Sequence, residues 1–172
     1  MEALMNVTTT NILPHPNYLE MLFAHKSAVN HVVKDVLGLY DVDHVAVSHI
    51  NHNKELLTLS STPSLEFNLF SSKLWRFDRT YQPNWYNTCA TSSWQSLYTP
   101  ERYDELYYLK QIKHHYPIGL SFAVKLTNTH VIYSIACRND CELTRDVFTN
   151  QHANLYKIGE YCSQALLPLI SS

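Results

Sequence analysis

Residues 118–137 constrain the fold of this chain most, because large and small side chains alternate there over two strand-length runs. Large hydrophobic residues occupy every second position of 120–126 and again of 131–137. The positions between them are mostly small and include Ser121, Ala123, Ser134 and Ala136. Alternation with a period of two is typical of half-buried strands, and the Thr-Asn-Thr segment between the runs is a short loop. The sequence therefore predicts a β-hairpin here.

A second hairpin is predicted nearer the N-terminus. Residues 43–50 alternate with the same period, residues 51–53 (Asn-His-Asn) have the composition of a turn, and residues 56–60 form the returning strand. Two hairpins that are separated by helical segments cannot build an all-parallel sheet. An antiparallel sheet is therefore expected.

Helical patterns flank and separate these hairpins. The predicted helices are 17–37 with a bend at Lys26–Ser27, one that starts at Thr62-Pro63, one from Thr99-Pro100 to about His114, and one that Thr144 caps and Pro168 ends. We predict an α/β fold, an α-β-α sandwich with a central antiparallel sheet and helices on both faces. This layout is similar to that of PAS and GAF sensor domains.

Length and composition favour one folded domain. The chain has 172 residues, of which 1–15 are polar and expected to be flexible, whereas 16–172 are expected to form a single sensor-type domain. Only 13 residues are Lys or Arg and the net charge is -2, so no direct binding to nucleic acid is expected. The sequence shows neither an apolar run of membrane-spanning length nor a signal peptide, which predicts a cytoplasmic protein that does not bind membranes.

The order of elements, together with Asp78, Trp94 and Gly119, resembles the N-terminal sensor domain of LuxR-type quorum-sensing regulators. The resemblance implies an α-β-α sandwich that binds acyl-homoserine lactones. It also places Leu65 and Leu69 where the family has a Trp and a Tyr. The family's Trp donates its indole N–H to the lactone carbonyl, and leucine has no such donor. The resemblance therefore implies a ligand other than a lactone in the usual pose.

The family's helix-turn-helix DNA-binding domain has no counterpart in this chain, so we expect no DNA-binding domain here. The chain is then either an excised sensor or a standalone relative of one.

The expected ligand site lies between the sheet and the aromatic middle of the chain. The resemblance makes Asp78 the acceptor of a ligand N–H or O–H group. The other candidate ligand-binding residues are Trp75, Tyr81, Trp85, Trp94, Ser121 and Ser134, which supply aromatic walls and small strand positions. Three competing interpretations remain open: Asp78 pairs with Arg76 or Arg79 at the surface, the aromatic residues form an ordinary core, and the small residues admit a closely packed helix.

Other chemistries have weaker support in the sequence. Histidines are frequent, but no CxxC pair or HExxH helix is present, so no metal and no cofactor are expected and His44, His49 and His52 are interpreted as surface and turn residues. Cys89 with a His and an Asp would be the nucleophile of a small cysteine-dependent enzyme, but its surroundings match no known signature. No enzymatic activity and no catalytic residues are expected.

We therefore interpret the chain as a small-molecule signal-sensing domain of a LuxR-type transcriptional regulator, or a standalone relative of it. The expected partners are an amphiphilic ligand and either a second copy of the chain or another regulator. The alternative function is that of a ligand-free interaction protein, such as an exported effector, with the same fold. A cysteine-dependent enzyme is the third and least favoured interpretation.

Overall fold

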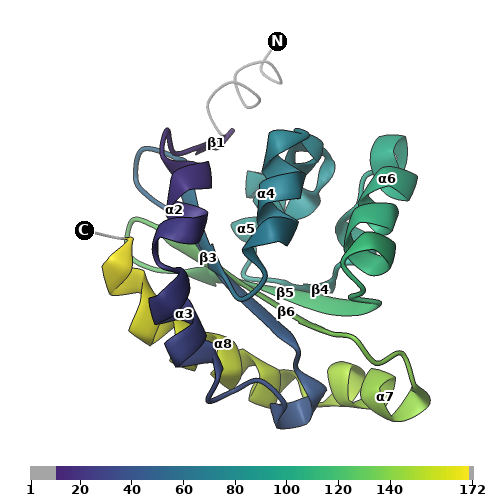
Figure 1. Cartoon of the computed structure of the whole chain (residues 1–172). Coiled ribbons are helices and arrows are strands. Elements are labelled where there is room, and N and C mark those ends of the chain that lie inside the picture. The colour runs from purple at the N-terminus through teal and green to yellow at the C-terminus, as the bar shows by residue number, and fades with distance from the viewer. Residues whose placement is uncertain (1–10, 171–172) are drawn as a thin grey trace.

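The computed structural model describes residues 11–170, and its centre is a six-stranded sheet in the order β1-β3-β2-β6-β5-β4 (Figure 1). The strands are β1 (Leu13–Pro14), β2 (His44–Ile50), β3 (Glu55–Ser60), β4 (Thr91–Ser93), β5 (Ile118–Lys125) and β6 (His130–Cys137). Every neighbouring pair is antiparallel except β1 with β3. Both predicted hairpins, β2–β3 and β5–β6, are confirmed.

Helices cover both faces of this sheet, which confirms the predicted α-β-α sandwich (Figure 1). The α-helices are α2 (Tyr18–Ala24), α3 (Lys26–Val33), α4 (Pro63–Ser71), α5 (Pro83–Tyr86), α6 (Tyr103–Tyr107), α7 (Glu142–Asn150) and α8 (His152–Leu166). The shorter 3-10 turns are η1 (Leu39–Asp41), η2 (Leu74–Phe77), η3 (Arg79–Tyr81), η4 (Gln95–Leu97), η5 (Pro100–Arg102) and η7 (Leu167–Leu169), and η6 (Tyr108–Lys113) is a π-helix.

Two hydrophobic cores lie on opposite faces of the sheet. One core joins α3, α7 and α8 to the face that carries Val45, Val47 and Ile135. The other joins α2, α4, α5 and α6 to the face that carries Ile50 and Ile132. The chain bends near Lys26 as predicted, because α2 ends at Ala24 and α3 begins at Lys26. At this bend the chain passes from one face of the sheet to the other, since α2 packs in one core and α3 in the other.

The predicted C-terminal helix begins earlier than expected, and it is divided at Gln151 into the two helices α7 and α8. Cys141 is the N-cap of α7, and Thr144 lies inside the helix with its hydroxyl donating to Asp41 Oδ2 at 3.1 Å. The expectation that Thr144 caps the helix is therefore wrong, because its hydroxyl contacts Asp41, a residue that is distant in the sequence, and Cys141 holds the N-cap position. Pro168 follows α8 in a 3-10 turn, as its missing N–H requires.

The segment before α2 is ordered where the structure describes it. The Leu13 N–H donates to the Lys54 carbonyl at 3.0 Å, the His15 N–H donates to the Leu56 carbonyl at 2.9 Å, and the Ile12 side chain is buried. Residues 11–15 of the segment that was expected to be flexible therefore contact the sheet and the core, while 1–10 lie outside the described residues. Within 11–170, no helix has the length and hydrophobicity needed to cross a membrane.

Candidate functional site

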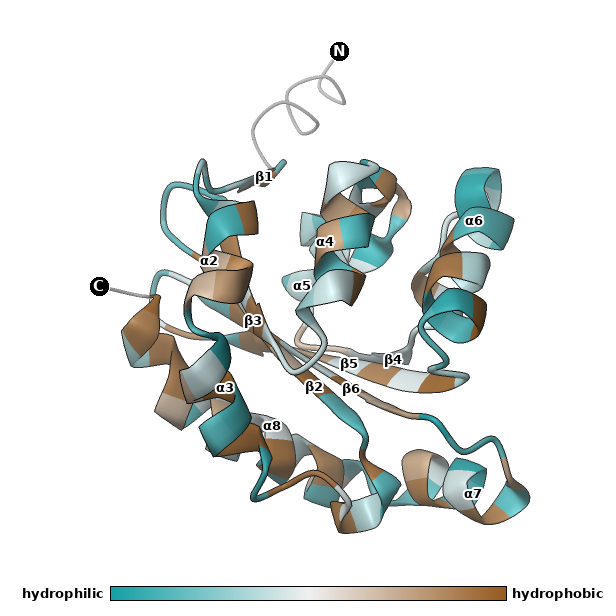
Figure 2. Ribbon diagram, viewed as in Figure 1, coloured by the Kyte–Doolittle hydropathy of each residue, from teal (hydrophilic) through white to brown (hydrophobic). Residues whose placement is uncertain are grey.

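The floor of the candidate site is the sheet face beneath α4, α5 and the segment that follows them. Cross-strand partners in the middle of this face form one row of small residues, which runs Ser60, Ala46, Ser134, Ser121 and Ser92. The opposite face carries large hydrophobic side chains at the intervening positions, and Figure 2 shows the resulting alternation of brown and pale bands along β5. The two candidates Ser121 and Ser134 therefore face the same side, with 3.4 Å between their hydroxyl oxygens.

The roof of the site is aromatic. Phe70 of α4 stacks on Trp75 of η2 with 5.5 Å between ring centroids, and it meets Tyr81 of η3 edge-on at 5.2 Å. Trp94 lies over Gly119 so closely that a Cβ atom at residue 119 would collide with the indole ring. Glycine is therefore required for this close approach of ring and strand.

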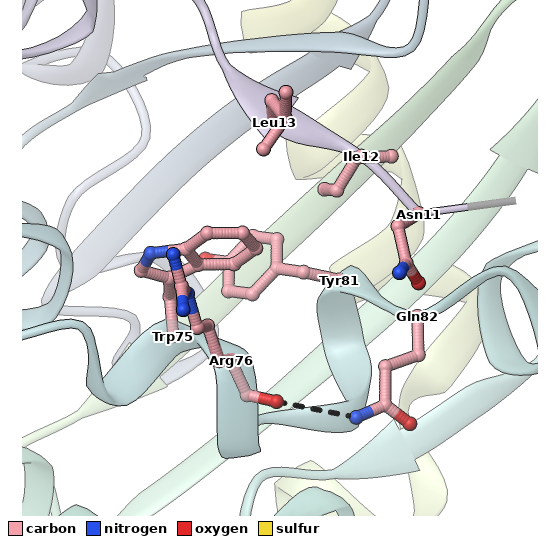
Figure 3. A pocket seen from close by; sticks show the side chains of 7 residues that line it. All are labelled: Asn11, Ile12, Leu13, Trp75, Arg76, Tyr81 and Gln82. Atoms are coloured by element: carbon pink, nitrogen blue, oxygen red, sulfur yellow. Dashed lines mark hydrogen bonds between the residues drawn. The ribbon is translucent and has the colours of Figure 1, made fainter. Parts of the chain in front are cut away.

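A pocket of about 380 Å³ opens at the edge of this roof (Figure 3). Figure 3 shows Trp75 and Tyr81 of the helical middle across the pocket from Ile12 and Leu13 of the N-terminal segment. The residues that line it are Asn11, Ile12, Leu13, Trp75, Arg76, Tyr81 and Gln82. Two of the predicted candidates, Trp75 and Tyr81, therefore line a pocket.

Tyr81 lines this pocket and also lies near a buried polar interior. Burial raises the pKa of the Tyr81 hydroxyl well above its ordinary value, and the nearby Tyr18, Asp78 and Glu66 raise it further. The ring therefore lines the pocket while its hydroxyl experiences the buried charges beneath the roof.

Asp78 is a buried member of this interior. Lys110 of η6 donates to Asp78 Oδ2 at 2.6 Å, and the Thr80 backbone N–H donates to Oδ1 at 3.0 Å. The Lys110 ammonium also lies 4.7 Å from the centroid of the Trp94 ring. Asp78 pairs with this lysine, so the interpretation that it pairs with Arg76 or Arg79 at the surface is wrong.

Glu66 of α4 is the second buried carboxyl. Only 4% of the residue is exposed, and burial raises its pKa to about 7, with smaller opposing effects from the Ser60 hydroxyl, its own backbone and Lys110. Its Oε2 lies 3.8 Å from His44 Nε2, and its Oε1 has no hydrogen-bond partner among the described residues.

His44, at the start of β2, is fully buried beside Glu66. Burial lowers its pKa to about 3, assisted by the positive charges of Lys110 and Arg138 and by His114, so the ring is neutral at physiological pH. Its Nδ1 shares a hydrogen bond of 3.1 Å with Thr62 Oγ1. His49 of β2 is buried too, so the interpretation of these two histidines as surface residues is wrong.

A chain of hydrogen bonds continues from His44 toward the surface. Thr62 Oγ1 and the Tyr116 hydroxyl are 2.6 Å apart, and Arg138 Nη2 donates to that hydroxyl at 2.9 Å. The buried polar groups are therefore joined to the end of β6, next to α7.

Trp85 lies at the other edge of the site. Its indole N–H donates to Ser92 Oγ of β4 at 2.9 Å, and its side chain is partly exposed. The structure thus places Trp75, Asp78, Tyr81 and Trp94 over the sheet, but it gives the Trp85 N–H a partner within the protein.

Sequence reasoning missed Tyr18, His44, Glu66 and Lys110. Glu66 could have been found, because it precedes Leu69 and Phe70 by three and four residues and therefore shares their buried helix face. Lys110 gave no such signal, since the π-helix of 108–113 changes which side chains point inward.

Metal and nucleophile chemistry find little support in the geometry. Within 11–170, no group of three or more His, Cys, Asp or Glu side chains is arranged to hold a metal ion. Cys89 lies exposed in the loop after α5, with a positive φ of 54°.

Comparisons with known proteins give structural matches only. No family model matches the sequence, and no curated protein matches it in sequence. The N-acylhomoserine lactone-dependent LuxR-family transcription factor CepR2 from Burkholderia cenocepacia matches with a TM-score of 0.64 at 10% identity, over 91% of this chain and 93% of that chain. Escherichia coli SdiA matches with a TM-score of 0.56 at 10% identity, over 88% of this chain and 64% of that chain.

A structure of SdiA in complex with octanoyl-rac-glycerol also matches, with a TM-score of 0.58 at 9% identity, over 97% of this chain and 65% of that chain. This chain therefore spans slightly less than two thirds of the SdiA chains. The fold is that of the autoinducer-binding domains of LuxR-family regulators, which confirms the resemblance expected from the sequence. These neighbours do not favour the interpretation as a cysteine-dependent enzyme.

Proposed function

We propose that this chain is a small-molecule sensor domain that binds an amphiphilic ligand between the small-residue floor of the sheet and the aromatic roof. The observation that carries the proposal is the buried cluster of Glu66, Asp78, Lys110 and His44. Burying ionisable groups is costly, and such groups cluster at functional sites. A hydrophobic core with no ligand to recognise would be more stable with apolar side chains at these positions.

The pocket and the polar cluster together favour a ligand with two unlike ends. Trp75, Tyr81 and Ile12 offer apolar surface at the pocket, and Tyr81 lies near Asp78 and Glu66, which raise the pKa of its hydroxyl. Apolar walls with a few polar groups are typical of small-molecule sites. The fold of CepR2, a lactone-dependent regulator, and of SdiA, which has been seen with an octanoyl glycerol, supports the same class of ligand.

Asp78 acts in this site together with Lys110. Both carboxylate oxygens already accept hydrogen bonds, so the carboxylate holds the ammonium in place beneath Trp94. An ammonium has three N–H donors. In the bound state the remaining donors of Lys110 and the free lone pairs of Asp78 contact the ligand, while Trp75, Tyr81, Trp85, Trp94, Ser121 and Ser134 surround it.

The domain is proposed to act in the cytoplasm without catalysis, linked to transcription through a second copy of itself or another regulator. The net charge of -2 supports the further expectation that it does not bind duplex DNA by itself.

Ligand binding is tested by thermal shift and tryptophan fluorescence with eight-carbon amphiphiles. Octanoyl glycerol, N-octanoyl-homoserine lactone, octanoate, octylammonium and methyl octanoate form the panel. At least one probe should raise the melting temperature in a saturable way, since a ligand that binds only the folded state stabilises it. Ser121→Val, which adds bulk to the floor, should weaken that effect, whereas Thr149→Val on exposed α7 should not. If no probe changes either signal, the ligand-free interaction protein becomes the better interpretation.

A further inference from the structure

Four buried side chains around the interior cluster leave polar atoms without partners. Among the described residues, Glu66 Oε1, Trp94 Nε1, Tyr18 Oη and His44 Nε2 have no hydrogen-bond partner in suitable geometry, although the Thr58 hydroxyl lies near Tyr18 and the Ser60 hydroxyl lies near Glu66. Each belongs to a residue that is at most 4% exposed. An unpaired polar atom at such depth is destabilising, so four of them together need an explanation.

These atoms belong to neighbouring side chains. Glu66 and His44 are 3.8 Å apart at their closest charged atoms, and the His44 ring meets the Trp94 ring edge-on at 5.9 Å between centroids. Glu66 also raises the pKa of Tyr18, second only to burial, so the Tyr18 hydroxyl lies within its field. The four atoms therefore lie in one region of the interior.

We propose that Glu66 anchors an uncharged, hydroxyl-bearing ligand head, such as the vicinal diol of a glyceryl group, and thereby selects the ligand. This proposal rests on the proposed function and specifies the chemistry of its site. The unpaired atoms require both a donor and an acceptor from the ligand, because Glu66 Oε1 accepts when ionised and Trp94 Nε1 only donates. A hydroxyl both donates and accepts a hydrogen bond, and two adjacent hydroxyls offer a donor and an acceptor at each of two positions.

Charged heads fit the same atoms less well. A carboxylate head has no hydrogen to donate, so it leaves Glu66 Oε1 unpaired, and it is repelled by Glu66 once that carboxyl is ionised. An ammonium head donates only, so it leaves the Trp94 N–H unpaired and lies near the Lys110 ammonium. A lactone head has a single N–H donor and a fixed arrangement of acceptors, whereas hydroxyl hydrogens rotate to suit their partners.

The test compares octanoyl glycerol with methyl octanoate, which has the same acyl chain but no hydroxyl. Affinities are measured by tryptophan fluorescence titration on the wild type, Glu66→Met, Glu66→Gln and the exposed control Glu105→Gln. At pH 8, where most of the Glu66 carboxyl is ionised, losing the hydrogen bond to this charged acceptor should weaken binding of octanoyl glycerol about 10- to 100-fold in Glu66→Met. Methyl octanoate should bind the wild type and Glu66→Met equally, and Glu66→Gln should keep much of the affinity because its amide oxygen still accepts.

The outcomes separate this inference from the proposed function. If octanoyl glycerol binds Glu66→Met as tightly as wild type, or octylammonium binds the wild type more tightly than octanoyl glycerol does, the assignment of Glu66 is wrong while the sensor function stands. If no eight-carbon probe binds the wild type, the proposed function itself fails. Circular dichroism melts of all four proteins confirm that they are folded during the titrations.

Discussion

The Lys110 ammonium lies 2.6 Å from Asp78 Oδ2, and both side chains are almost completely buried. The lysine comes from the π-helix η6 and the aspartate from the junction of η2 and η3, 32 residues earlier in the chain. The ion pair therefore joins the helix formed by α6 and η6 to the short 3-10 turns η2 and η3. Its place in the fold makes it a stabilising contact as well as a candidate ligand contact.

Removing one partner of this pair should be strongly destabilising. Asp78→Ala leaves the Lys110 ammonium buried without a counter-charge, and we expect a loss of about 3–5 kcal/mol in the free energy of unfolding. The double variant Asp78→Leu with Lys110→Met, which replaces both charges by apolar side chains, should recover most of that loss. Urea unfolding followed by circular dichroism measures both.

An exposed ion pair provides the matched control. Arg102 Nη1 and Glu105 Oε1 are 2.7 Å apart, but about half of each side chain is in solvent. Glu105→Ala should therefore change the free energy of unfolding by less than about 1 kcal/mol. Equal losses in Asp78→Ala and Glu105→Ala would show that the buried pair has no special role.

The sequence was sufficient to predict the layers of the fold. Period-two alternation in 43–60 and 118–137 identified two hairpins, and the helical patterns between them predicted the sandwich. These signals are local, because the spacing of hydrophobic residues along a single strand or helix shows which of its faces is buried. The parallel pairing of β1 with β3 was not predicted, since a strand of two residues has no periodicity.

The site could be predicted only in part for a similar reason. Trp75, Asp78, Tyr81 and Trp94 were predicted as site residues because aromatic residues concentrate in that segment and because its spacing resembles a known family. The partner of Asp78 could not be found in this way, since neither sequence distance nor composition shows that Lys110 faces inward. Contacts between distant segments depend on how the helices pack, and packing leaves no local pattern.

The packing of the N-terminal segment can be tested by substitution. Ile12 is 2% exposed and packs into the core beneath the roof, whereas its neighbour Leu13 is 64% exposed. Ile12→Ala should lower the free energy of unfolding by about 2–4 kcal/mol, because it deletes buried methyl groups. Leu13→Ala should change it by less than about 0.5 kcal/mol. Similar, small effects of both substitutions in urea melts would mean that residues 11–15 do not pack as described.

Glu66 should make stability depend on pH in a direction opposite to His44. The folded state raises the pKa of Glu66 from 4.5 to about 7, so its contribution is fully present below pH 4.5 and is lost as the pH rises through 7. The folded state lowers the pKa of His44 from 6.5 to about 3, so its contribution is present above pH 6.5 and is lost as the pH falls through 3. Between pH 4.5 and 6.5 the two effects oppose each other.

Glu66→Gln isolates the carboxyl, because every other titrating group remains in both proteins and cancels in the difference between them. A change in pKa from 4.5 to about 7 corresponds to about 3 kcal/mol, at roughly 1.4 kcal/mol for each pH unit. The unfolding free energy of the wild type minus that of Glu66→Gln should therefore fall by up to about 3 kcal/mol between pH 4.5 and pH 8. Urea melts at intervals of half a pH unit measure this difference. A difference that stays constant over the range would mean that the Glu66 carboxyl is not buried in the folded protein, and the ligand site built on it would be lost as well.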